Sequence, residues 1–99
     1  MNIRQLMKQA QQMQDRMQRE LAELEVEASV GGGMVTVKMN GHKQLLAVAV
    51  DPEVLDPKDP GMIQDLVLAA VNEAGRKIDE EMQTRLGGML PGIPGLPVG

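Results

Sequence analysis

The chain has 99 residues, with 10 Lys or Arg against 14 Asp or Glu, so its formal net charge is −4. This length predicts a single domain with a modest core. The acidic balance argues against a strongly basic nucleic-acid-binding arm and leaves room only for a local basic face. The sequence contains no cysteine, which excludes disulfides and thiolate chemistry. It also contains no aromatic residue, so it cannot hold single-stranded nucleic acid by stacking bases on aromatic rings.

The sequence shows no segment that would direct the chain into or across a membrane. The first residues lack the apolar stretch of a secretory signal, and no apolar run approaches the roughly 20 residues of a membrane span. We therefore expect a cytoplasmic protein.

Residues 1–23 are predicted to form a long helix with one apolar stripe. The stripe consists of apolar residues that recur at steps of three and four: Ile3, Leu6, Ala10, Met13, Met17, Leu21 and Leu24. At about 100° per residue, Arg4, Lys8 and Arg19 fall within about 60° of one another. Arg16 follows about 60° further round, so this basic sector lies nearly opposite the apolar stripe. The sector is either a solvated outer face or a surface for an anionic partner, and periodicity alone favours the solvated face.

Three strands are predicted to follow this helix. Residues 24–30 alternate between apolar and acidic or polar side chains, which indicates a strand with its acidic face toward water. Residues 31–33 are all glycine and predict a flexible turn or bulge. A phosphate-binding loop is a poor alternative, because no Gly-Lys-Ser/Thr follows and the loop leads into a strand.

The stretch from residue 35 to residue 50 is predicted to be a hairpin around which the rest of the chain is organised. Its two arms meet at Asn40-Gly41, a pair that favours a tight turn because both residues tolerate positive φ. The first arm has one apolar face, whereas the second arm is apolar on both faces. We therefore expect the second arm to be the central strand, in a small sheet placed between two long helices.

Three prolines between residues 51 and 60 exclude a regular helix or strand there, although Asp51-Pro52-Glu53 could begin a single helical turn. The acidic residues of this stretch lack the glycine and the spacing of a calcium loop. Asp59 is the expected N-cap of the second long helix, with Pro60 at its first position.

The second helix is expected to run from about Pro60 to Arg85 and to end at Gly87-Gly88. Its first half is apolar on more than one face, so we expect it to pack on the sheet and on something else. Its second half is highly charged and is expected to project into solvent; its basic residues are Arg76, Lys77 and Arg85. Residues 1–88 would then form one domain, and residues 89–99 a flexible Pro/Gly-rich tail.

The sequence offers little catalytic chemistry. His42 is the single histidine and sits beside the predicted turn, where a surface role is expected. No Ser/His/Asp set and no HExxH-type metal spacing occurs, so we expect no enzymatic activity, no metal site and no cofactor. A three-stranded sheet has exposed edges, and the second helix has more apolar surface than one small sheet can cover. Both features favour a homodimer.

With these elements placed, residues 1–92 resemble the YbaB/EbfC family of bacterial nucleoid-associated proteins. The resemblance rests on the order and spacing of several segments, none of them diagnostic alone: the Met/Gln-rich segment 6–14, Gly33-Met34-Val35-Thr36-Val37, Gly41, Val50-Asp51-Pro52-Glu53-Val54-Leu55, the segment 66–74 and Pro91-Gly92. It implies a tight α+β homodimer with a shared antiparallel sheet and helices that project like tweezer arms. It also implies binding of duplex DNA through those helices and a role in organising the nucleoid.

The family resemblance makes DNA binding the favoured interpretation of the basic sector. The family supplies no sharply fixed DNA-binding motif, so the predicted DNA-binding residues come from the helix-face argument: Arg4, Lys8, Arg16, Arg19 and, less directly, Arg76, Lys77 and Arg85. Contacts to phosphates predict little or no strict sequence preference.

Two other interpretations remain at this point. The acidic strand face and the amphipathic helices could instead make the chain a dimeric protein–protein adaptor associated with DNA repair or replication. The first helix could also lie on a membrane surface, but its polar face is mostly Gln and no Trp or Phe anchors its apolar face.

Overall fold

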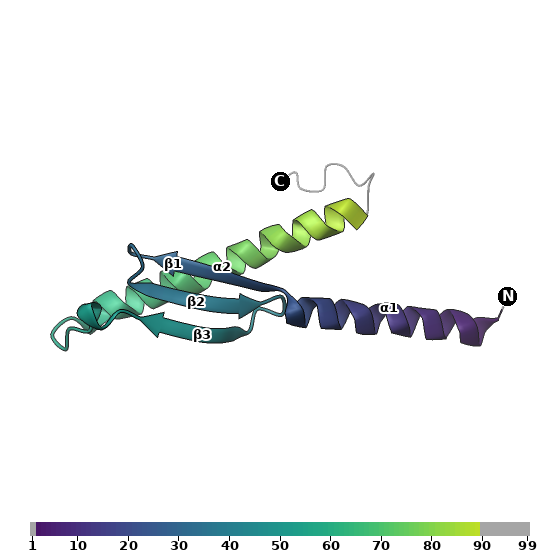
Figure 1. Ribbon diagram of the computed structural model, residues 1–99, viewed down its shortest axis with the longest axis horizontal. Helices are drawn as coiled ribbons and strands as arrows, with labels where there is room; N and C mark the ends of the chain where they lie inside the picture. Colours follow the sequence, from purple (N-terminus) through teal and green to yellow (C-terminus); the bar gives the residue numbers. More distant parts are fainter. Residues whose placement is uncertain (1, 90–99) are drawn as a thin grey trace.

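The chain folds into two long helices and one three-stranded antiparallel sheet. The computed structural model describes residues 2–89 and, of these, the side chains of residues 2–85. The elements follow one another in this order: α1 (Ile3–Glu23), β1 (Glu25–Val30), β2 (Val35–Asn40), β3 (Leu45–Val50), the 3-10 turn η1 (Pro52–Val54) and α2 (Pro60–Met89) (Figure 1). The predicted α+β class and the three-stranded antiparallel sheet are confirmed.

The core lies between α2 and one face of the sheet. Ala70, Ala74 and Ile78, spaced four residues apart, form the buried side of α2. They pack with Val35 and Val37 of β2, which are fully buried. Two alanines at this crossing let the helix approach the strands closely, and Ile78 fills the space beyond them.

The prediction that the second hairpin arm is the central strand is wrong. The strand order is β1-β2-β3, so β2 is central and β3 is an edge strand. Two consecutive short connections produce a meander, and a meander places its second strand in the middle whatever the polarity of the third. Because α2 packs on β1 and β2, it leaves β3 uncovered. Leu46 and Val48 of β3 are each 48% exposed.

The expectation of a sheet enclosed by two helices holds for one face only. None of the residues of α1 is buried, and the helix extends beyond the end of the sheet (Figure 1). Its last turn is attached, because the Gly41 backbone N–H donates to the carbonyl of Leu21 over 2.8 Å and Leu24, directly after the helix, is buried. Helix α1 is therefore an arm held at its C-terminal end.

The predicted hairpin turn does begin at Asn40-Gly41, where the Lys43 backbone N–H donates to the Asn40 carbonyl over 2.9 Å, but the connection to β3 is longer than the tight turn that was expected. The structure gives these two residues different tasks. Asn40 ends β2, and its buried side-chain oxygen accepts hydrogen bonds from the backbone N–H groups of His42 and Gln44. The residue with positive φ in this connection is Lys43, at 63°. Gly41 is required for space, because a Cβ there would lie 2.6 Å from the carbonyl oxygen of Leu21.

The turn between β1 and β2 and the start of α2 agree with the sequence. Gly31, Gly32 and Gly33 all adopt positive φ and form the predicted turn. The Asp59 carboxylate accepts a hydrogen bond from the Met62 backbone N–H over 3.3 Å, as expected of an N-cap.

The predicted end of α2 is wrong. The helix passes through both glycines and ends at Met89. A glycine costs only about 1 kcal/mol in a helix, whereas Pro91 disfavours the helical conformation of the residue before it. Except for Met89, the predicted tail lies outside the described residues.

Candidate nucleic-acid interface

The basic residues of α1 lie on an exposed, projecting helix. The helix begins where Asn2 accepts a hydrogen bond from the Arg4 backbone N–H over 3.0 Å, which satisfies one of the free donors of the first turn. Arg4, Lys8, Arg16 and Arg19 are all exposed. Among residues 2–85, the cations found in ion pairs are Lys43 and two arginines of α2, and none of the four on α1.

Charge is unevenly distributed between this arm and the rest of the chain. Residues 3–19 contain four basic side chains and one acidic side chain, Asp15. Residues 20–99 contain six basic and thirteen acidic side chains. The net charge of −4 therefore hides a positively charged arm on an acidic body.

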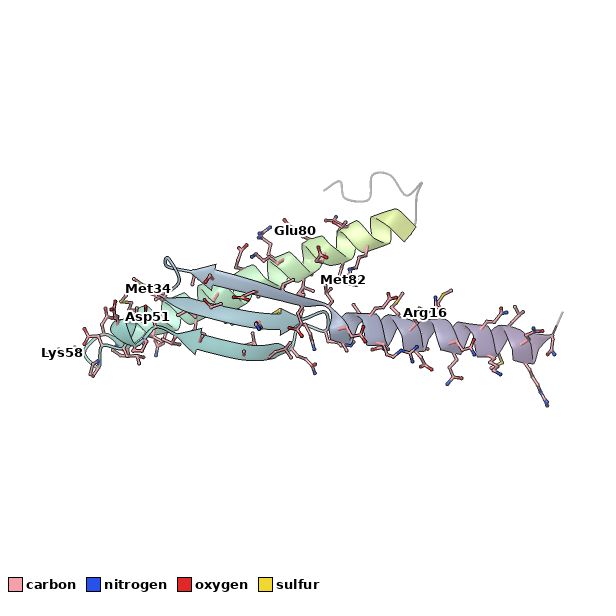
Figure 2. All side chains as sticks on the ribbon, in the orientation of Figure 1. Arg16, Met34, Asp51, Lys58, Glu80 and Met82 are labelled. Atoms are coloured by element: carbon pink, nitrogen blue, oxygen red, sulfur yellow. The ribbon has the colours of Figure 1, made fainter. Side chains whose placement is uncertain are left out.

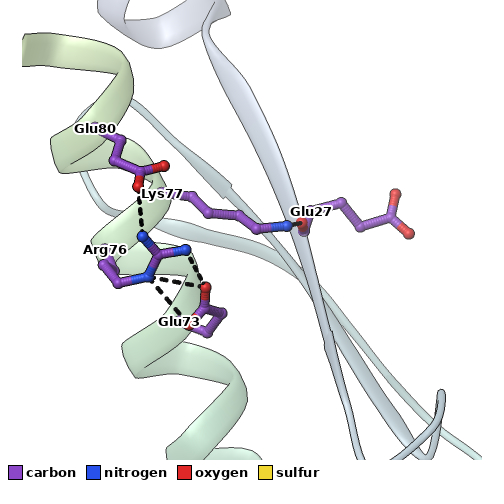
Figure 3. A network of polar contacts seen from close by, with 5 residues as sticks. All are labelled: Glu27, Glu73, Arg76, Lys77 and Glu80. Atoms are coloured by element: carbon purple, nitrogen blue, oxygen red, sulfur yellow. Dashed lines mark hydrogen bonds and ion pairs between the residues drawn. The ribbon is translucent and has the colours of Figure 1, made fainter. Parts of the chain in front are cut away.

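Arg76 of α2 has very different surroundings. Its guanidinium donates to the carboxylates of Glu73 and Glu80 on the same helix, with Nε 2.9 Å from Glu73 Oε1 (Figure 3). These hydrogen bonds raise the pKa of Arg76 above its usual value. The side-chain hydrogen bond from Arg76 in turn lowers the pKa of Glu73. The positive charge at this point is thus locally compensated.

The other predicted basic residues of α2 also have partners. Lys77 reaches across to the sheet, where its Nζ donates to the backbone carbonyl of Glu27 over 2.8 Å and ties α2 to β1 (Figure 3). Arg85 Nε lies 3.8 Å from Glu81 Oε1. The sequence therefore placed all three residues correctly on one helix but could not show these interactions.

Arg16 of α1 and Arg85 of α2, two of the predicted DNA-binding residues, lie beside one groove that the sequence did not reveal. The groove lies between the last three turns of α1 and the far half of α2, and has a volume of about 210 Å³. Its lining is mainly apolar: Met13, Met17, Leu21, Leu24 and Met82, with Arg16, Glu20 and Arg85 beside them. Figure 2 shows Arg16 on α1 and Met82 on α2. The sequence did hint at an apolar surface on this part of α2, because Met82 continues the apolar spacing of the helix beyond Ile78.

No metal-binding cluster accompanies these residues in the described part of the chain. Within residues 2–89, no three His, Asp or Glu side chains gather in a way that could hold a metal ion. His42 is exposed, as expected. None of the helices described is long and apolar enough to cross a membrane.

Comparison with known proteins identifies the family. Residues 1–93 match the model of the YbaB/EbfC DNA-binding family. The chain belongs to this family. It is 50% identical over 96 residues to a nucleoid-associated protein of Koribacter versatilis, a match that covers 97% of this chain and 94% of that protein. It is 54% identical over 101 residues to a nucleoid-associated protein of Acetivibrio thermocellus, covering 96% of this chain and 89% of the relative.

A solved structure has a similar fold. An uncharacterized protein from Helicobacter pylori aligns with a TM-score of 0.66 at 22% identity, covering 86% of this chain and 99% of the other. At this level of identity the match concerns the fold alone. The family model and the two relatives confirm the family assignment made from the sequence.

Proposed function

We propose that this chain acts as a homodimer that binds duplex DNA through the basic face of α1, with little or no strict sequence preference. The observation that carries the proposal is the combination of a projecting helix and four exposed basic side chains outside the ion pairs of residues 2–85. Membership of a DNA-binding family agrees with it. The family also supports a cytoplasmic location at the nucleoid.

The spacing of the α1 cations suits a phosphate backbone. With a rise of 1.5 Å per residue, Arg4 and Arg19 are about 22 Å apart along the helix axis. A duplex carries one phosphate charge for about every 1.7 Å of its axis, so an arm of this length can lie close to several phosphates. Contacts to phosphates fix position and orientation without reading bases, which is why we expect little sequence preference. We expect no catalytic step.

The three basic residues of α2 take a secondary place in this proposal. A guanidinium that already binds two carboxylates has to leave them before it can neutralise a phosphate. Lys77 fixes α2 to β1 and would have to break that hydrogen bond. We therefore assign the main DNA contacts to the α1 set and treat Arg76, Lys77 and Arg85 as peripheral.

The proposed dimer rests on β3. This strand is an edge, is apolar on both faces and is left uncovered by α2. Leu45, Leu46 and Val48 are between 44% and 48% exposed, although such residues are usually buried. A second copy related by a two-fold axis would cover this strand with the same surface of its own. Two α1 arms would then contribute to one DNA-binding molecule.

Titration of a labelled DNA duplex tests the proposal. The wild type is compared with a variant in which Arg4, Lys8 and Arg19 are replaced by Glu, and with a matched variant in which Arg76, Lys77 and Arg85 are replaced by Glu. We expect the α1 variant to lose at least tenfold in affinity and the α2 variant to lose much less. Unlabelled single-stranded DNA is expected to compete weakly, because the chain has no aromatic residue on which to stack bases.

The same titration separates DNA binding from the adaptor interpretation. If no binding occurs even at low salt, while the protein remains folded and dimeric, the faces of α1 serve a protein partner. If the two charge variants lose affinity equally, the assignment of the site to α1 is wrong.

A further inference from the structure

We propose that α1 carries a docking surface for the α1 of a second copy, so that two arms from different dimers pack antiparallel and bridge two DNA duplexes. This surface, the α1 seam, consists of five apolar residues: Ile3, Leu6, Ala10, Met13 and Met17. The bridging of duplexes rests on the proposed function, whereas the pairing of the arms does not.

The α1 seam is exposed although its pattern is that of a packing face. Ile3 is 69%, Leu6 47% and Met13 65% exposed, and none of the residues of α1 is buried. In a soluble protein an apolar stripe of this kind normally faces a partner. Because α1 is held to the sheet only by its last turn, the body of the chain does not supply that partner within residues 2–85.

The spacing of the seam residues selects another helix as the partner. They recur in steps of three, four, three and four, which is the a and d pattern of a coiled coil. None of them is charged, so two copies can meet without burying a charge. In an antiparallel pair the flanking positions bring Gln9 beside Arg16 and Met7 beside Gln14 of the second copy, so no two like charges meet.

Charge selects the antiparallel direction. Four basic and one acidic side chain give residues 3–19 a net charge of +3, and six basic and thirteen acidic ones give residues 20–99 a net charge of −7. Parallel arms would place two acidic bodies side by side. Antiparallel arms instead bring the basic tip of each arm toward the acidic last turn of the other, which contains Glu20 and Glu23. The seam therefore fits a second copy in this direction.

The antiparallel register also fills the groove between α1 and α2. The a and d positions interlock when Ala10 lies opposite Met13 of the second copy and Leu6 lies opposite Met17. Ile3 and Leu6 of each arm then lie over the groove of the other, where Met13 and Met17 form part of the wall. The groove has a volume of about 210 Å³, and a cavity of about 150 Å³ already holds benzene, so it can accept these two side chains.

Arm pairing leaves the predicted DNA-binding face free. At about 100° per residue, Arg4, Lys8 and Arg19 lie about 140° to 180° from the centre of the seam. In a pair these cations face away from the seam on both sides, so one duplex can bind on each side. The seam spans only about two heptads, so we expect weak pairing between free dimers. Binding to DNA concentrates the arms and thereby favours pairing.

Capture of a second duplex tests the bridging. An immobilised duplex is incubated with the full chain and a free labelled duplex, and the label retained on the beads is measured. The seam variant combines Leu6→Gln with Met13→Gln, which keeps the charge and the helix propensity of α1. We expect it to retain at least about fivefold less label than the wild type while binding a single duplex equally well.

A matched control combines Gln5→Ala with Gln12→Ala, two exposed positions of α1 outside the seam. We expect this control to retain as much label as the wild type. If the wild type retains no second duplex, or if the seam variant retains as much as the wild type, bridging through the α1 seam is wrong.

Disulfide trapping tests the seam without DNA, so its result stands even if duplex binding fails. The chain has no cysteine, so Ala10→Cys protein and 15N-labelled Met13→Cys protein can be mixed at high concentration under mild oxidation. The antiparallel register predicts that the mixed disulfide exceeds either homodisulfide at least about fivefold. A statistical mixture would contradict that register, and no cross-linking would mean that something other than a second α1 covers the stripe.

The size of the trapped species shows which copies are joined. Cross-linked protein that sediments as a tetramer or larger supports pairing between different dimers, whereas a cross-linked dimer would overturn it. If the mixed disulfide forms but the wild type binds no single duplex, the seam is supported and both bridging and the proposed function are wrong.

Discussion

Lys8 and Arg76 illustrate how side chains of equal charge differ in what they can bind. Lys8 lies on a helix that projects away from the acidic body, and no ion pair of residues 2–85 includes it. Arg76 is held by Glu73 and Glu80 through several hydrogen bonds. The sequence predicted both as candidates from their helix faces. It gave Arg76 the weaker case but could not show its ion pairs, because a carboxylate three or four residues away engages a cation only when both side chains adopt suitable rotamers.

The first prediction concerns the pKa of Glu73. Because Arg76 hydrogen-bonds to the charged form, the pKa of Glu73 lies below its ordinary value of 4.5. The pair therefore contributes to stability above about pH 4.5, and this contribution disappears as the pH falls through the lowered pKa. An Arg76→Gln variant should return the midpoint toward the ordinary value, as measured by a 13C NMR titration of the Glu73 carboxyl group. Identical midpoints in both proteins would show that the pair does not form in solution.

The second prediction compares two glycines. Gly41→Ala places a Cβ against the backbone of Leu21, with contacts of 2.6 Å to its carbonyl oxygen and 2.9 Å to its Cα. Since backbone atoms cannot move aside easily, we expect a decrease of about 1–3 kcal/mol in the free energy of unfolding. Gly75→Ala, in helix α2, meets nothing within 4 Å and should instead stabilise the protein by about 1 kcal/mol.

Urea unfolding followed by circular dichroism measures both changes. A Gly41→Ala variant as stable as the wild type would mean that α1 is not held against the connection between β2 and β3. The helix would then lack its close attachment at that point.

At the scale of elements, β3 shows what polarity can and cannot predict. The sequence correctly showed a strand that is apolar on both faces, but we interpreted this as a central position. Its place at the edge follows from the two short connections of a meander, which the sequence also contains. A bulge in the pairing of β2 with β3 leaves Leu46 as the extra residue of the edge strand. Its apolar surface is therefore better explained by a partner that covers it than by burial within one chain.

The third prediction tests that explanation. Val48→Lys introduces a charge at the centre of the uncovered strand, where a second copy would have to desolvate it. We expect the dimer to weaken at least tenfold, equivalent to about 1.4 kcal/mol, as measured by analytical ultracentrifugation without DNA. Met7→Lys is the matched control, because Met7 is 67% exposed on the α1 arm. If Val48→Lys leaves the dimer intact, β3 is not the interface.

At the scale of the whole molecule, the chain is far from compact. Its radius of gyration is 18.8 Å, compared with about 13 Å for a compact domain of this length. The difference reflects α1, which extends from the sheet and carries three net positive charges on residues 3–19. This separation places the cations away from most of the acidic groups, so an acidic protein can still present a surface that attracts phosphate.

The sequence predicted most of this architecture and less of the candidate site. Helix α1, the glycine turn and the Asp59 cap depend on local patterns, and all three occur as expected. The order of the strands, the role of Gly41 and the groove between the helices depend on packing between distant segments. Such packing cannot be read from the spacing of residues along one helix or strand.

The most direct test of the account is the salt dependence of duplex binding. The observed binding constant is measured between low and near-physiological salt for the wild type and for a variant with Arg4, Lys8 and Arg19 replaced by Gln. If these side chains neutralise phosphates, the slope of log K against log salt should become less steep by about 0.9 for each phosphate that the variant no longer neutralises. An unchanged slope in a variant that remains folded and dimeric would contradict the assignment of DNA binding to α1.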